Sequence, residues 1–120
     1  MEKRRIADSD LRIMNIIWDN EPLSSMHLVE LCLKELNWKK STTFTMLRKM
    51  CEKGYAKNEQ STVTSVIPRS EVQRSESRLF VNQTFAGSLP GFLVSFMDGK
   101  TISDKEAEEL KRLIDEHREE

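Results

Sequence analysis

A helical pattern that ends at a glycine and is followed at once by two strand-like runs is the feature that most restricts the fold. The helical pattern ends at Gly54, and the strand-forming runs cover residues 55–59 and 62–67, with Gln60-Ser61 as the turn between them. Glycine readily adopts the left-handed conformation in which many helices end. A hairpin placed directly behind a helix is the arrangement of a winged helix-turn-helix, provided that two further helices precede it.

Two helices are predicted ahead of this segment. The first follows Asp8 or Ser9, either of which could cap it, and ends within residues 19–22. Ser24 is expected to cap the second, and Asn37-Trp38 forms the turn that leads into the third. Apolar residues recur at helical spacing in both: Leu11, Met14, Ile17 and Trp18 in the first, and Leu28, Val29, Cys32, Leu33 and Leu36 in the second. Pro68 is expected to close the domain, because proline cannot continue an internal ladder.

The third helix has an unusual outward face. The face expected to be buried contains Thr43, Met46, Leu47 and Met50. The outward face contains Thr42, Thr45, Arg48, Lys49 and Glu52. Threonine lowers helix stability, so this composition needs another reason. Hydroxyls, methyl groups and cations are groups that bind in the major groove of DNA. The alternative is a solvent-exposed face that happens to be rich in Thr. Phe44 lies at the boundary, where it could pack against Leu47 or contact a thymine methyl.

The charge distribution favours binding to nucleic acid. The net charge is −1, yet residues 37–60 hold six basic and two acidic residues, and Lys3, Arg4 and Arg5 add positive charge at the N-terminus. Residues 101–120 hold eight acidic and four basic residues. The positive field therefore belongs to the half of the chain with the third helix, as phosphate binding requires. The residues predicted to contact double-stranded DNA are Lys39, Lys40, Ser41, Thr42, Phe44, Thr45, Arg48, Lys49, Lys57, Ser61 and Thr62.

Three more helices are predicted after Pro68. The first runs from Ser70 to about Thr84, the second begins after Gly87-Ser88, and the third follows the capping sequence 103–106. A segment of this size cannot bury its aromatic residues alone, and a second copy of the chain is the economical partner. The residues predicted to form the dimer interface are Leu79, Phe80, Leu89, Phe92, Leu93, Phe96, Met97, Leu110, Leu113 and Ile114. The expected fold is thus mostly α with a small β-hairpin: a winged helix-turn-helix in residues 1–68 and a three-helix dimerisation domain in residues 69–120.

Other functional classes find little support in the sequence. Cys32 and Cys51 read as buried free thiols rather than a disulfide or metal pair, and His27 and His117 lack ligand spacing. Neither a nucleophile beside a base nor a glycine-rich phosphate loop is recognisable, so we expect no enzyme and no cofactor. No apolar run approaches the roughly 20 residues that span a bilayer, so a cytoplasmic protein without membrane insertion is expected. A winged-helix module that binds a protein partner or dimerises without binding DNA stays the alternative.

The chain resembles the penicillinase repressor family, the BlaI and MecI type of transcriptional repressor, over nearly its whole length. The matching residues are Ile6, the run 11–18, Trp38, Thr42, Thr45, Lys53-Gly54-Tyr55, Gly87-Ser88-Leu89 and the run 102–110. No single motif is specific, but together they are. The C-x-C pairs of a copper-responsive branch of that family do not occur after Cys51, which disfavours a copper sensor.

The resemblance implies a dimeric bacterial repressor that binds a dyad-symmetric operator in a promoter, including promoters of β-lactam-resistance genes. It implies that Thr42 and Thr45 meet DNA and that Lys49 meets the phosphate backbone. It also implies relief of repression by proteolysis, which a membrane β-lactam sensor orders through a sensor-linked protease. Ser95-Phe96 occupies the place where a repressor of that family is cleaved.

Overall fold

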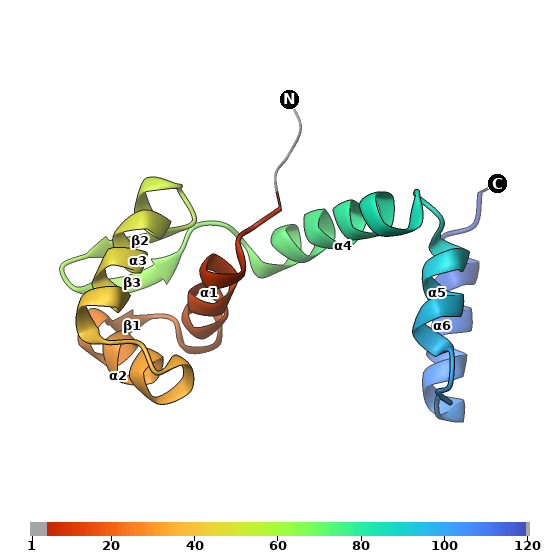
Figure 1. The fold of residues 1–120 in the computed structure, drawn as a ribbon, viewed down its shortest axis with the longest axis horizontal. Coiled ribbons are helices and arrows are strands. Elements are labelled where there is room, and N and C mark those ends of the chain that lie inside the picture. Colours follow the sequence, from red (N-terminus) through yellow and green to blue (C-terminus); the bar gives the residue numbers. More distant parts are fainter. Residues whose placement is uncertain (1–4, 120) are drawn as a thin grey trace. The chain divides into compact units, whose positions relative to one another are not determined.

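The computed structural model describes residues 5–119, so Lys3 and Arg4 of the N-terminal basic cluster lie outside the described residues. The chain forms two compact units, which divide between Phe80 and Val81. The first unit contains α1 (Asp8–Asn20), β1 (Leu23–Ser24), α2 (Ser25–Leu36), α3 (Lys40–Glu52), β2 (Ala56–Glu59) and β3 (Thr62–Ser65) (Figure 1). Helix α4 (Arg69–Phe85) begins in this unit and continues into the second, which also holds α5 (Leu89–Met97) and α6 (Asp104–Glu116). The division thus falls inside α4, later in the chain than the boundary expected at Pro68.

The first unit has the winged-helix order predicted from the sequence, with a core formed by all three helices and the sheet. The most deeply buried side chains come from every one of these elements: Ile13, Met14 and Ile17 of α1, Leu28 and Cys32 of α2, Thr43 and Met50 of α3, and Val63 of β3. The prediction for Leu33 was wrong, because this residue was expected in the apolar stripe of α2 and is more than half exposed. Burying each large apolar side chain contributes about 1.5–3 kcal/mol.

The sheet is larger than the predicted hairpin. β2 and β3 pair antiparallel around the Gln60-Ser61 turn, and β1 adds a third strand on the other side of β3, in the order β1-β3-β2. Leu23 lies opposite Val63, so both apolar side chains enter the core from neighbouring strands. The prediction of a hairpin alone was therefore incomplete. The two residues of β1 are too few to show a strand period, and the strand is defined only by its pairing with β3.

Local signals place most helix ends. The Ser24 hydroxyl accepts a hydrogen bond from the His27 N–H, as a capping residue should. Asn37 ends α2 in the left-handed conformation with φ 57°, and Gly54 follows α3 with φ 80°. The start of α1 differs from the prediction. Its N-cap is Ala7 without a side-chain cap, so neither Asp8 nor Ser9 caps it, and both lie inside the helix.

The second unit is built from helices that bury little of their own surface. Ser88 caps α5 and Ser103 caps α6, each by accepting a hydrogen bond from the N–H three residues ahead. The rings of Phe85, Phe92 and Phe96 form a row, with centroids 5.5 and 5.8 Å apart. No described residue of α5 or α6 is buried, and Phe96 is more than half exposed. An apolar surface of this kind is typical of an interaction face.

Candidate nucleic-acid interface

The outward face of α3 carries the predicted DNA contacts. Lys39 is the N-cap of this helix, and the predicted residues on the helix itself are Lys40, Ser41, Thr42, Phe44, Thr45, Arg48 and Lys49. All of them are exposed. Hydroxyls and cations therefore share one solvent-facing surface, which is the chemistry that contacts phosphates and base edges.

The opposite face of α3 holds the helix in place. Thr43, Leu47 and Met50 are buried at or below 2% exposure, and Met46 packs against the core at its edge. At the end of α3, Lys53 Nζ lies 2.6 Å from the buried Asp10 carboxylate of α1. That hydrogen bond to Asp10 raises the pKa of Lys53. The exposed face of α3 thus belongs to a helix that is fixed along its length and at its C-terminal end.

Phe44 is the apolar member of this surface. Its side chain is 36% exposed, and the ammonium group of Lys40 lies 5.9 Å from the ring centroid, one helical turn away. The sequence left two roles open, contact with DNA or packing against Leu47, and a ring with this exposure is accessible to DNA. The ring offers an apolar surface among cations, which is what a thymine methyl group can meet.

The hairpin of β2 and β3 presents a second polar surface. Lys57, Ser61 and Thr62 are exposed as predicted. Lys57 pairs across the strands with Thr64, and Glu59 with Thr62, so these side chains share the face that points away from the core. Glu59 lies 3.7 Å from Lys57 and offsets part of its charge. The Ser61 carbonyl accepts a hydrogen bond from Ser25 N, which attaches the tip of the hairpin to the start of α2.

Both cysteines are free thiols inside the first unit. Cys32 is buried and Cys51 half-buried. Burial raises the pKa of the Cys32 thiol, and the neighbouring Thr43 hydroxyl lowers it in part. Burial likewise raises the pKa of the Cys51 thiol. A raised pKa disfavours the thiolate, so neither cysteine has the environment of a reactive nucleophile.

The predicted interface residues Leu79 and Phe80 lie on α4 in the first unit, half-buried, whereas the others lie in the second unit. There the more exposed ones are Leu89, Phe96, Leu113 and Ile114, and the half-buried ones are Phe92, Leu93, Met97 and Leu110. Ser95 and Phe96 lie inside α5 and are exposed. Within residues 5–119 no helix is long and apolar enough to cross a membrane.

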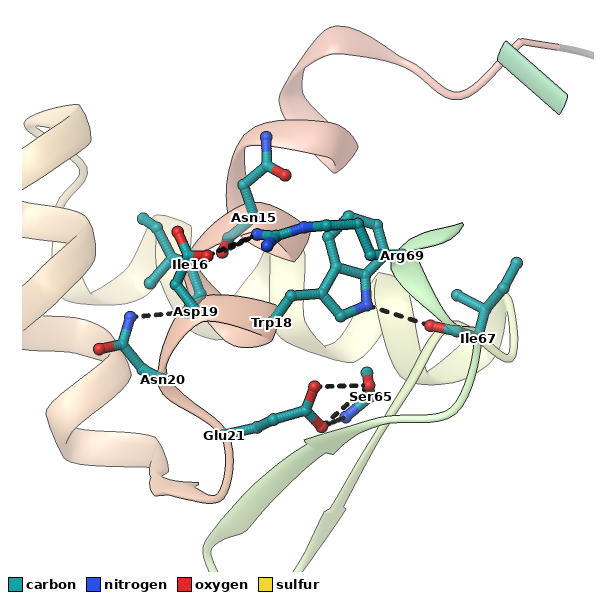
Figure 2. A network of polar contacts seen from close by, with 9 residues as sticks. All are labelled: Asn15, Ile16, Trp18, Asp19, Asn20, Glu21, Ser65, Ile67 and Arg69. Carbon is teal, nitrogen blue, oxygen red and sulfur yellow. Dashed lines mark hydrogen bonds and ion pairs between the residues drawn. The ribbon is translucent and has the colours of Figure 1, made fainter. Parts of the chain in front are cut away.

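One group of residues was not recognised from the sequence. Trp18, Asp19 and Arg69 form a contact network where α4 begins (Figure 2), and Glu21 binds Ser65 beside it. Arg69 and Asp19 lie 50 residues apart in the chain, and Ser65 and Glu21 lie 44 residues apart. No local spacing could have indicated these contacts.

The chain is similar in sequence to known proteins. The model of the family described as penicillinase repressor matches residues 6–116. The penicillinase repressor of Bacillus licheniformis is 25% identical over 118 residues, covering 95% of this chain and 92% of that protein. The methicillin resistance regulatory protein MecI of Staphylococcus aureus is 22% identical over 113 residues, covering 91% and 92%.

A solved structure matches more than half of the chain. It is the solution structure of the Bacillus licheniformis BlaI monomer in complex with the blaP half-operator, with 26% identity and a TM-score of 0.50. The match covers 59% of this chain and 93% of that one.

Proposed function

This chain belongs to the penicillinase repressor family, and on that premise we propose that it is a dimeric transcriptional repressor that binds a dyad-symmetric operator in promoter DNA. Each first unit would place α3 in the major groove of one half-site and the hairpin along the phosphate backbone. The observation that carries this proposal is the single exposed face of α3, where Thr42, Thr45, Arg48 and Lys49 lie together on a helix whose other face is locked in the core.

The residues divide into two roles on chemical grounds. Lys39, Lys40, Lys49 and Lys57 supply charge without the geometry that distinguishes bases, so they suit phosphates. Thr42 and Thr45 are short, polar and one turn apart on the outward face, so they suit base edges. Operator affinity would then depend on both groups, whereas affinity for random duplexes would depend on the lysines alone.

The test is a selection of bound duplexes from a random pool, followed by affinity measurement at two salt concentrations. Lys49→Ala should weaken binding to every duplex and reduce the salt slope by about 1. Thr45→Ala should cost about 1–3 kcal/mol on the selected duplex and little on random duplex. An unchanged ratio of specific to non-specific affinity in both Thr42→Ala and Thr45→Ala would remove this face from base readout. If no duplex is bound in a salt-dependent manner, the chain is a winged-helix module that acts on another kind of partner.

Dimerisation would use the exposed apolar residues of α5 and α6, since a second copy would cover them.

Relief of repression would follow cleavage at Ser95-Phe96 by a sensor-linked protease. Proteases bind extended chain, so α5 must unwind locally first. The helix is only nine residues long and has Pro90 and Gly91 in its first turn. A chain shortened to end at Ser95 should sediment as a monomer, and its affinity for a full operator should fall toward that for a half-site.

A further inference from the structure

A polar network attaches the first residue of α4 to α1 (Figure 2). The Arg69 guanidinium donates from one nitrogen to the Asn15 carbonyl at 3.1 Å and to the Asp19 carboxylate at 2.7 Å. The same guanidinium lies over the ring of Trp18, 5.2 Å from its centroid. Two hydrogen bonds and one cation–π contact therefore restrain the position of this side chain.

The segment that precedes Arg69 is restrained as well. Trp18 Nε1 donates to the Ile67 carbonyl at 3.0 Å, so the ring beneath Arg69 also holds the chain two residues earlier. From the other side, the N–H groups of Val66 and Ile67 both donate to the Tyr55 carbonyl, at 2.8 and 3.2 Å. The connection between β3 and α4 is thus attached to α1 and to the loop that follows α3.

Contacts continue along the first turns of α4. Val72 is buried, and the Glu76 carboxylate accepts hydrogen bonds from Ile6 N at 2.7 Å and from Arg5 Nε at 2.9 Å. Beyond these contacts α4 runs on as one helix past Phe80, where the first compact unit ends. The chain passes from the DNA-reading unit to the next unit through this helix.

Arg69 contributes little to the stability of the winged helix, and its main effect is on the orientation of α4. Asp19 is 61% exposed, and an ion pair with an exposed partner contributes only about 0–1 kcal/mol. Its removal would therefore leave the winged helix folded. The direction of α4, by contrast, depends on where its first residue is held.

We propose that Trp18, Asp19 and Arg69 form a clamp that fixes the direction in which α4 leaves the winged helix, and that this direction sets the half-site spacing that the dimer binds best. The inference rests on the proposed function. In a symmetric dimer the distance between the two reading helices must match the operator, with half-sites about 34–36 Å or a multiple apart. A stiff connection gives high avidity at one spacing, whereas a loose connection gives lower avidity over several spacings.

The experiment uses the full chain with a selected half-site sequence, presented as a single half-site and as dyad pairs whose spacer grows one base pair at a time. The wild type should bind one spacer at least about tenfold more tightly than the single half-site. Arg69→Ala should bind the single half-site within about twofold of the wild type, while its preferred spacer loses most of that advantage and neighbouring spacers gain. Trp18→Phe keeps an aromatic ring but lacks the indole N–H that binds the Ile67 carbonyl, so it should flatten the profile in the same way.

Arg74→Ala is the matched control, since it removes an exposed arginine from the same helix and should leave the profile unchanged. An Arg69→Ala profile like that of the wild type, or an equal loss on single and paired half-sites, overturns the clamp. A wild type that binds neither the single half-site nor any pair overturns the proposed function itself. A wild type that binds the single half-site but prefers no spacer contradicts the clamp alone.

Discussion

One ion pair holds the C-terminal end of α3, and the effect of its removal can be predicted at the level of a single residue. The Asp10 carboxylate is buried, whereas its partner Lys53 is half exposed. Lys53→Met keeps most of the aliphatic stem and leaves the buried carboxylate without its charged donor. We expect the free energy of unfolding to fall by about 1–3 kcal/mol, measured by urea denaturation at neutral pH. Lys49→Met, on the exposed face of α3, should change it little.

The same pair predicts a dependence on alkaline pH. The hydrogen bond to Asp10 raises the pKa of Lys53 above its ordinary value of 10.5. A raised folded-state pKa means that this stabilisation is complete below the ordinary pKa and is lost as the pH rises through the higher one. The difference in unfolding free energy between wild type and Lys53→Met should stay constant from neutral pH to about pH 10 and shrink above it. A difference that shrinks already near neutral pH would contradict this assignment.

Phe44 allows a test in which the DNA, rather than the protein, loses one methyl group. If the exposed ring meets a thymine methyl, replacing thymine by uracil in the selected duplex removes that contact and keeps every hydrogen-bonding group. Wild-type binding should weaken by about 0.8 kcal/mol for one buried methyl, or about fourfold. Phe44→Ala should be insensitive to the same replacement. Equal sensitivity of the two proteins would show that Phe44 does not read this group.

Among the elements, the hairpin turn has a strained backbone, and no residue pattern in the sequence predicts this strain. Gln60 and Ser61 both have positive φ, 50° and 64°, in a turn type that prefers Asn-Gly. Replacing both, Gln60→Asn with Ser61→Gly, should raise the free energy of unfolding by about 1 kcal/mol, measured as a higher melting temperature. Gly54→Ala is the opposite control. Its Cβ would meet no atom within 4 Å, so the expected loss of stability comes from the backbone at φ 80° alone. If the double variant is no more stable than the wild type, the turn is not strained.

The elements predicted well from the sequence are those with local signals. Ser24, Ser88 and Ser103 cap the predicted helices, and Gly54 follows α3 at a positive φ. The helical period of α3 also predicted its outward face correctly. Thr43 and Leu47 are buried, and Thr42 and Thr45 are exposed. β1 and the Arg69 network escaped prediction for one physical reason. Both depend on partners that lie about 40 residues or more away, and such contacts leave no local period.

At the scale of the molecule, charge and apolar surface are separated between the two units. The basic face belongs to α3 and the hairpin, whereas acidic residues dominate 101–120, and five of the nine large apolar residues that are exposed in the described part of the chain lie on α5 and α6. This separation keeps the two tasks independent, because a change on one surface need not alter the other. Repression would nevertheless require both units, since avidity for a dyad operator exists only while two reading helices are linked.

Phe96 provides the test of that linkage. Its ring ends the row formed with Phe85 and Phe92, and more than half of it is exposed in the single chain, beneath the Lys100 ammonium at 5.1 Å. If a second copy covers the ring, Phe96→Ala should weaken the dimer by about 3–5 kcal/mol, which raises the dissociation constant at least about a hundredfold in sedimentation equilibrium.

Phe44→Ala is the matched control for this change, because it removes the same ring from an exposed helix face of the other unit. We expect it to leave the dimer intact and to act only on DNA binding. Phe96→Ala should instead keep the affinity for a single half-site and lose the additional affinity for the paired operator. If both variants shift the monomer–dimer equilibrium equally, or if neither does, the α5 face is not the dimer interface.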